Sequence, residues 1–371
     1  MELHDVIIVG AGPAGSTAGR ILASAGFDVL VIDKDTFPRE KPCAGWISPM
    51  ALTLSGISPK EYREKATLIS FSSVVIWDTK NRPREVRFKK TLGYGIIRSE
   101  FDTTLLEEIK GVSLREGVRI TSIERDDDGL ILNDSLKAKV VIGAGGHSCP
   151  AAKRFGEIRK DEKIIAAVVS ESRIGKDEIK KHTQYPDIPE IIFNDDFSGY
   201  GWYFSKGDYL NIGIGSTITK DINSYKNRLL EKLDKIGRLP DPELFPLSKF
   251  RGHVYKLNKL TPRRLVTDRV LLIGDACGMS YNMSGEGIGP AIFSGFAAAQ
   301  TIIDAGGDYS ANSLSIYLKL IYSKFGRPYP DFLLHLASSV PKITFHLIKN
   351  ATVGTSLGRS EIIAKRWFFR D

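Results

Sequence analysis

The sequence predicts an α/β fold in which an antiparallel sheet is inserted into a parallel one. Apolar, β-branched runs at Val6–Val9 and 27–32 flank a helical pattern over 16–25, which is typical of a parallel βαβ unit. Runs of alternating polar and apolar residues follow between positions 68 and 215, as expected of antiparallel strands. An apolar run over 269–276 then returns the chain to the first sheet.

The first βαβ unit contains a glycine-rich turn. The turn is formed by Gly10, Ala11, Gly12, Pro13, Ala14 and Gly15. In such a turn Gly10 permits the tight bend, Gly12 lets a pyrophosphate approach the backbone, and Gly15 lets the helix pack closely on the strand. The free N–H groups at the helix N-terminus favour phosphate, and Asp33 at the end of the second strand can accept hydrogen bonds from a ribose. We therefore predict a dinucleotide site; a glycine turn without a ligand is the alternative.

The length and the cysteines restrict the class of protein. The chain has 371 residues, of which 42% are hydrophobic, enough for two domains or for one domain with a large insertion. Cys43, Cys149 and Cys277 are widely spaced, show no metal-ligand pattern and cannot all pair, which favours a reducing compartment and no metal site. The first strand follows Met1 to His4 directly, so we expect no signal peptide and a cytoplasmic protein.

The basic charge is concentrated near the C-terminus. The net charge is +8, from 52 basic and 44 acidic residues, and nine basic residues but only three acidic ones follow Ser313. A basic tail suits nucleic acid or an anionic membrane, and no nucleic-acid motif accompanies it. Because apolar segments at 332–334 and 345–348 lie beside the basic residues, we expect helices that touch an anionic membrane surface; ordinary helices packed on the domain are the alternative. The uncharged run 287–303 contains Gly289, Pro290 and Gly295, which favours a buried helix over a membrane span.

The remaining elements are predicted from their periodicity. We expect strands over 68–78, 84–89, 118–124, 129–132, 139–142, 164–172, 190–194, 200–204, 209–215 and 255–257, and helices over 99–109, with Ser99 as its N-cap, and 221–236. They give a dinucleotide domain over 1–66, 90–157 and 263–310, an inserted substrate domain over 67–89 and 158–262, and a C-terminal helical region over 311–371.

Three further segments are candidates for chemistry. The loop 39–46 leaves the carboxyl end of the second strand, where open α/β sheets bind ligands; the spacing of Cys43 alone favours a small buried hydrophobe over a cofactor contact. Tyr200, Trp202 and Phe204 share one strand face, which is either core or the wall of an apolar pocket. Asp275 follows a buried strand beside a glycine-bearing loop, so we expect it to contact a ligand rather than only to cap a helix.

These segments together resemble the FAD-dependent geranylgeranyl reductase family, on the fold of p-hydroxybenzoate hydroxylase-like flavoproteins, over about residues 3–310. The resemblance rests on the glycine turn, Lys41-Pro42-Cys43-Ala44-Gly45, the hairpin from Tyr200 through Asn211 to Gly215, and Gly274-Asp275-Ala276 with Gly285-Glu286-Gly287-Ile288. Three positions depart from the family pattern: Gly145 replaces an aspartate, Ser205 a proline and Ala44 a glycine.

The resemblance implies a role for each candidate residue. Non-covalent FAD would be bound by Gly10, Gly12, Pro13, Ala14, Gly15, Asp33, Lys34, Cys43, Ala44, Arg98, Ile123, Gly274, Asp275, Gly285, Gly287 and Ile288. The substrate would be bound by Trp46, Tyr200, Trp202 and Phe204, and Cys43 and Tyr200 are the candidate catalytic residues. We expect Asp275→Ala to lower FAD occupancy more than Asp33→Ala, on the assumption that Asp33 sits at an exposed ribose.

The function that this resemblance implies is reduction of C=C bonds in an isoprenoid lipid by hydride transfer from reduced flavin. The electron donor would be NAD(P)H or a ferredoxin-type protein. Two alternatives stay open, a flavin monooxygenase that acts on a small aromatic or polyketide, and a non-catalytic electron-transfer flavoprotein.

Overall fold

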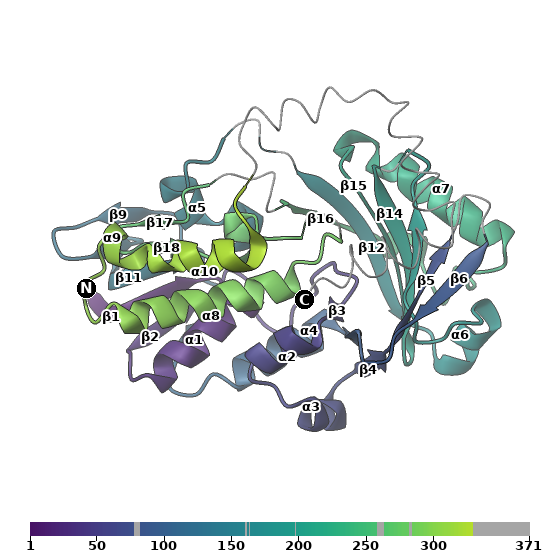
Figure 1. Ribbon diagram of the computed structural model, residues 1–371, viewed down its shortest axis with the longest axis horizontal. Coiled ribbons are helices and arrows are strands. Elements are labelled where there is room, and N and C mark those ends of the chain that lie inside the picture. Colours follow the sequence, from purple (N-terminus) through teal and green to yellow (C-terminus); the bar gives the residue numbers. More distant parts are fainter. Residues whose placement is uncertain are drawn as a thin grey trace.

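The computed structural model describes residues 1–328, apart from 78–81, 160–161, 163, 197, 258–262 and 282–283. Two large sheets lie at opposite ends of the molecule, with the first at the left of Figure 1 and the second at the right. A small third sheet lies between them, so the α/β class with an added antiparallel sheet is confirmed.

The first sheet has a parallel centre. Its parallel strands, in spatial order, are β18 (Val270–Leu272), β11 (Leu136–Gly143), β1 (Glu2–Val9), β2 (Val29–Ile32) and β8 (Ser113–Arg115). Antiparallel strands β17 (Val266–Thr267), β10 (Leu130–Leu132) and β9 (Ile123–Arg125) extend it. All four residues of β2 are buried, as expected of strands covered on both faces.

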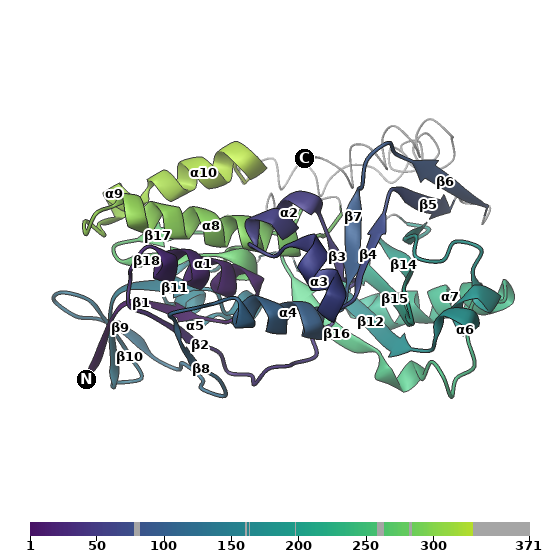
Figure 2. The same cartoon turned by 90° about the horizontal axis from the view of Figure 1, so that it is seen from below.

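Helices cover both faces of this sheet. They are α1 (Pro13–Ser24), α4 (Arg98–Glu107), α5 (Pro150–Phe155), α8 (Ile288–Asp304), α9 (Ala311–Leu314) and α10 (Ile316–Phe325). Figure 2 shows α8 stacked over α1, with α10 outside both. A Cβ at Gly295 would lie 2.3 Å from the Ala14 carbonyl oxygen, so glycine is needed where α8 crosses α1. The apolar run over 287–303 is thus a buried helix, as predicted; within the described ranges, no helix is long and apolar enough to cross a membrane.

The second sheet forms the other end of the molecule. Its strands, in spatial order, are β16 (Arg251–Tyr255), β12 (Ile165–Arg173), β15 (Tyr209–Ser216), β14 (Gly199–Lys206), β13 (Glu190–Phe193), β5 (Ser73–Trp77) and β6 (Pro83–Arg87). Neighbours pair antiparallel except β13 and β5, which are parallel. Helices α6 (Lys176–His182) and α7 (Ile222–Lys235) contribute to the apolar cluster on one face, leaving the other face toward the rest of the molecule.

The third sheet connects the two ends. It consists of β3 (Trp46–Ile47), β7 (Gly93–Ile96) and β4 (Leu68–Phe71), flanked by α2 (Pro49–Leu54) and α3 (Pro59–Lys65). The single strand predicted over 68–78 is therefore wrong. The chain leaves this sheet after Phe71 and enters the second sheet at Ser73, a change of partner that alternation alone cannot reveal.

Three other predicted boundaries are wrong. Residues 118–122 precede β9 and run beside a cavity instead of joining a ladder, since two of their N–H groups are bound by the Asn133 side chain. Helix α4 begins at Arg98, with Ile97 and not Ser99 at the N-cap, and Arg98 pairs with Asp102 one turn ahead. The strand expected at 255–257 ends at Tyr255.

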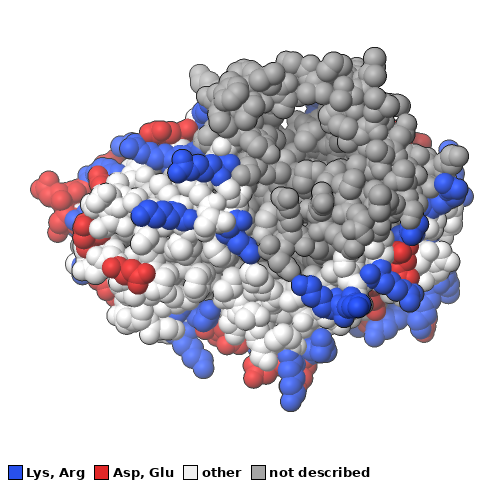
Figure 3. All heavy atoms as spheres, viewed as in Figure 1, with Lys and Arg blue, Asp and Glu red and all other residues white. Residues whose placement is uncertain are grey.

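The described part of the C-terminal region is helical, as predicted. Tyr317 of α10 is buried and donates a hydrogen bond of 2.8 Å to the Leu272 carbonyl, which fixes this helix to the first sheet. The apolar segments expected at 332–334 and 345–348 lie outside the described residues. On the face in Figure 3, basic and acidic side chains are interspersed over the described surface.

Candidate functional site

Two adjoining cavities lie at the carboxyl ends of the parallel strands of the first sheet and reach the second sheet. The larger, of about 1030 Å³, is lined by the glycine turn, the end of β2, residues 118–125, residues 144–148 and Pro150. The smaller, of about 230 Å³, is lined by the loop 41–46, the aromatic hairpin and residues 284–289. Both cavities are bordered by Pro13, Lys41, Pro42, His253 and Ala291. A ligand extended along the larger cavity would therefore reach the smaller one.

The glycine turn has the sterics of a phosphate loop. Gly10 has φ +118°, and a Cβ there would lie 2.4 Å from the Ala144 carbonyl oxygen. A Cβ at Gly15 would lie 1.9 Å from the Gly10 carbonyl oxygen. A Cβ at Gly12 would meet only the Arg39 guanidinium, at 3.5 Å. Gly10 and Gly15 are thus required by the fold, whereas Gly12 keeps space open in the cavity.

The N-terminus of α1 is available to an anion. Gly12 is its N-cap, no side chain caps it, and its first turn contains no acidic residue. Its first N–H groups and its dipole therefore face the larger cavity without competition from a carboxylate. This arrangement fits a pyrophosphate.

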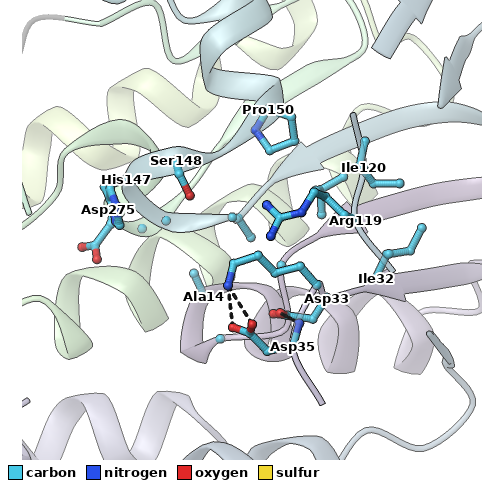
Figure 4. Close-up of a pocket in the computed structure, with 18 of the residues that line it drawn as sticks. Ala14, Ile32, Asp33, Asp35, Arg119, Ile120, His147, Ser148, Pro150 and Asp275 are labelled. Carbon is cyan, nitrogen blue, oxygen red and sulfur yellow. Dashed lines mark hydrogen bonds and ion pairs between the residues drawn. The ribbon is translucent and has the colours of Figure 1, made fainter. Parts of the chain in front are cut away.

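Asp33 borders the larger cavity but is not exposed. Only 8% of its surface is accessible, and its carboxylate accepts hydrogen bonds of 2.7 Å from the Ala11 N–H and 2.9 Å from the Asp35 N–H. Asp33 therefore also holds the glycine turn, a structural role beyond the predicted ribose contact, which stays a prediction. Lys34 pairs with Asp35 at 2.7 Å; Figure 4 shows Asp35 with Asp33 and Arg119 nearby.

We expect Asp33→Ala to lower both FAD occupancy and the stability of the apoprotein. The Ala11 N–H would lose its acceptor in a buried position, at a cost of about 1–3 kcal/mol. Thermal unfolding of the apoprotein and the FAD content of the purified protein measure the two effects. An unchanged melting temperature would contradict the structural role.

Charged groups gather where the two cavities meet. His253 Nε2 lies 3.6 Å from the Asp275 carboxylate, and the His147 and His253 rings are 5.7 Å apart. Burial alone would raise the pKa of Asp275, but His253 and the charges of Lys41 and Arg98 outweigh it and hold that pKa at about 2. Burial lowers the pKa of Lys41. Asp275 is therefore an ionised acceptor for ligand hydroxyl groups; Figure 4 shows it beside His147.

The loop containing Cys43 is fastened to the hairpin by a buried lysine. Lys206 has no accessible surface and donates to the carbonyls of Ala44 (3.1 Å) and Ile96 (2.9 Å). Its charge is paired with Glu171. A Cβ at Gly45 would lie 2.6 Å from the lysine Nζ, so this loop fits closely over the lysine.

Asn211 extends this network to the aromatic hairpin. Its side-chain N–H groups donate to the Cys43 carbonyl (2.9 Å) and to Glu171 (2.7 Å). Its carbonyl oxygen accepts a 2.6 Å hydrogen bond from the Trp202 indole. One side chain therefore sets both the Cys43 backbone and the Trp202 ring. Sequence reasoning missed this role, although a lysine and an asparagine within apolar strands were a visible signal.

The aromatic face predicted for the hairpin is present. Tyr200, Trp202 and Phe204 all line the smaller cavity, whereas Tyr203 packs on the opposite face. The Trp46 ring lies 6.5 Å from that of Phe204 and lines the same cavity. These four predicted substrate residues are therefore brought together.

The two candidate catalytic groups are both engaged. The Tyr200 hydroxyl donates to the Ser284 carbonyl, and burial raises its pKa well above the usual value. Cys43 Sγ accepts a 3.3 Å contact from the Gly45 N–H. Both residues line the smaller cavity, but these contacts do not identify either residue as the proton donor.

The other predicted cofactor residues divide between the two cavities. Ile123 and Gly274 line the larger one, whereas Ala44, Gly285, Gly287 and Ile288 line the smaller one. Arg98 also faces the smaller cavity, but its guanidinium binds Asp102 through contacts of 3.0 and 2.8 Å. This pair raises the pKa of Arg98 against the effect of burial. Arg98 thus supplies a fixed positive charge.

The comparisons with known proteins agree with this geometry. The FAD binding domain family matches residues 4–307. The chain belongs to this family. An uncharacterized protein from Methanosarcina barkeri is 32% identical over 311 residues, with 81% of this chain and 75% of that protein covered. A digeranylgeranylglycerophospholipid reductase from Methanosphaera stadtmanae is 28% identical, with 88% and 85% covered.

Other similar proteins are named for different activities. A probable electron transfer flavoprotein-quinone oxidoreductase of Escherichia coli is 28% identical, with 85% of this chain and 80% of that protein covered. A geranylgeranyl bacteriochlorophyll reductase-like structure from Thermoplasma acidophilum has a TM-score of 0.75 at 23% identity, with 99% and 97% covered. A probable FAD-dependent monooxygenase from Pseudomonas aeruginosa has a TM-score of 0.65 at 19% identity, with 94% and 96% covered.

The predicted resemblance and the predicted cofactor are thereby confirmed. The protein is a FAD-dependent oxidoreductase of the FAD binding domain family, and it is similar to digeranylgeranylglycerophospholipid reductases. The uncapped helix α1, the open position at Gly12 and the ionised Asp275 fit the phosphates and hydroxyl groups of FAD.

Proposed function

We propose that this protein reduces carbon–carbon double bonds in an isoprenoid chain. The observation that carries the proposal is the smaller cavity, which adjoins the nucleotide cavity and has aromatic and aliphatic walls. Its walls include Trp46, Leu92, Val169, Ile191, Trp202 and Phe204. The digeranylgeranylglycerophospholipid reductases among the relatives support the same substrate class.

The residues of this chain would bind and orient both reactants. The N-terminus of α1 and Asp275 would hold the cofactor, whose bound, reduced ring supplies a hydride. Lys206 and Asn211 fix the loop containing Cys43, and the aromatic face positions a prenyl chain by shape and apolar contact. Such positioning is needed because the chain has no polar group along its length.

An anaerobic single turnover tests the proposal. The FAD-loaded protein is reduced with dithionite and mixed with a geranylgeranyl lipid; we expect flavin reoxidation together with a product heavier by two hydrogens for each bond reduced. A monooxygenase would instead reoxidise only with oxygen and insert an oxygen atom into an aromatic substrate. An electron-transfer flavoprotein would pass its electrons to a quinone or a protein partner and leave the lipid unchanged.

We further propose that the C-terminal region brings the protein to an anionic membrane. Lys324 and Phe325 of α10 border the smaller cavity, next to the exposed Met50 of α2. A basic residue beside apolar ones at an opening suits a lipid surface.

We expect the protein to co-sediment with liposomes that contain anionic lipid and to be released by salt, because the attraction is electrostatic. Neutral liposomes are the control. Binding that ignores both lipid charge and salt would remove the membrane role.

A further inference from the structure

One carboxyl group of the smaller cavity has no assigned role. Glu286 lies between two glycines just before α8, and its Oε1 accepts a 2.7 Å hydrogen bond from the Gly289 N–H. Its backbone is held by the Tyr281 N–H at 3.0 Å and by Ser284 Oγ at 3.3 Å. Within the described part of the chain, Oε2 has no hydrogen-bond partner and no cation pairs with the carboxyl group.

This environment favours the neutral acid. Burial raises the pKa of Glu286 to about 7, and among the described residues the Gly289 N–H opposes the shift. Asp275 lies near the same loop, since a Cβ at Gly287 would be 3.5 Å from its Oδ1, but its pKa is about 2. Two nearby carboxyl groups with such different pKa values are typical of an active site in which one group is ionised and the other is protonated.

We propose that Glu286 is the acid that protonates the substrate carbon when a double bond is reduced; this inference rests on the proposed function. The π bond breaks and two C–H bonds form. The reduced cofactor would supply one hydrogen as a hydride, together with both electrons. The other arrives as a proton from the Glu286 carboxyl, whose O–H bond breaks to leave a carboxylate that water reprotonates.

Other ionisable groups line the same cavity. They are Lys41, Cys43, Arg98, Tyr200, His253, Tyr255, Tyr281 and Lys324. Burial raises the pKa of Tyr200 and of Tyr255, and the Tyr200 proton is given to the Ser284 carbonyl. Glu286 is the carboxyl group of this lining, and within the described residues one of its two oxygens has no hydrogen-bond partner.

Glu286→Gln is the decisive variant, because glutamine keeps an acceptor for the Gly289 N–H but cannot donate as an acid. In anaerobic single turnovers we expect the wild-type rate of prenyl reduction to fall roughly tenfold per pH unit above pH 7 and the variant to lose about a hundredfold at pH 6. The pH profile of the variant should also lack the inflection near pH 7 that this fall produces in the wild type. Tyr200→Phe and His253→Asn test the competing groups in the same assay, and both should retain the inflection.

A second measurement is independent of turnover. The pKa of Glu286 in the folded state is raised above its usual 4.5. Its contribution to the stability of the folded protein is therefore full below pH 4.5 and is lost as the pH rises through about 7. The melting temperature of the Glu286→Gln apoprotein should therefore rise relative to wild type between pH 4.5 and 8. An infrared carboxylic-acid band present at pH 6 in wild type and absent from the variant reports the same proton.

The outcomes separate the two proposals. A wild-type protein that reduces no prenyl chain overturns both. A wild-type protein that does reduce it, with a Glu286→Gln variant of equal rate and equal pH profile, overturns only the role of Glu286. Loss of the inflection in His253→Asn but not in Glu286→Gln would also overturn it.

Discussion

Trp202→Ala is expected to slow hydride transfer to a prenyl chain by about a hundredfold while FAD remains bound. Trp202 lines the smaller cavity, and its indole is seated against Gly213, where a Cβ would lie 2.2 Å from the ring. Removal of the ring opens a void beside the substrate and leaves the Asn211 oxygen without its donor. Small misplacement of a reacting carbon costs on the order of a hundredfold in rate.

The matched control for this variant is Tyr203→Ala. Tyr203 is on the same strand and 1% exposed, but it packs on the opposite face. Both changes should lower the free energy of unfolding, by about 3–5 kcal/mol, the cost observed for fully buried aromatic residues. Of the two, Trp202→Ala alone should slow the single turnover of the reduced protein. Equal single-turnover rates for Trp202→Ala and wild type would show that the hairpin is only core.

Gly12→Val is expected to weaken FAD binding on the order of a hundredfold, about 2.7 kcal/mol, without unfolding the protein. Gly12 has φ −74° and ψ −178°, extended backbone that any residue adopts. The new side chain would therefore fit the protein but occupy the space that the glycine leaves open in the cavity. Titration of the apoprotein with FAD measures the loss.

Gly15→Ala separates a cofactor effect from a folding effect. Its Cβ would overlap the Gly10 carbonyl at 1.9 Å, so this smaller change should lower the melting temperature of the apoprotein, whereas Gly12→Val should leave it nearly unchanged. If Gly12→Val instead bound FAD as wild type does, the larger cavity would not hold the pyrophosphate at this turn.

Much of the cofactor site was determined by local sequence. The turn from Gly10 to Gly15 joins β1 to the first turn of α1, and β2 follows that helix directly, so spacing alone predicts its geometry. The aromatic face of β14 follows from period-two alternation in the same way. In both cases the interacting residues are separated by a few positions, and backbone periodicity fixes their relative orientation.

Only the tertiary structure decided how these local pieces meet. Lys206 and the Cys43 loop are far apart in sequence, and their contact depends on the packing of the second sheet against the third. The raised pKa of Glu286 and the lowered pKa of Asp275 likewise depend on which charges lie nearby. His253, Lys41 and Arg98 come from distant segments and lower the pKa of Asp275 but not that of Glu286. Periodicity gives the direction of a side chain, but burial and electrostatic environment are set by neighbours that only the folded chain brings together.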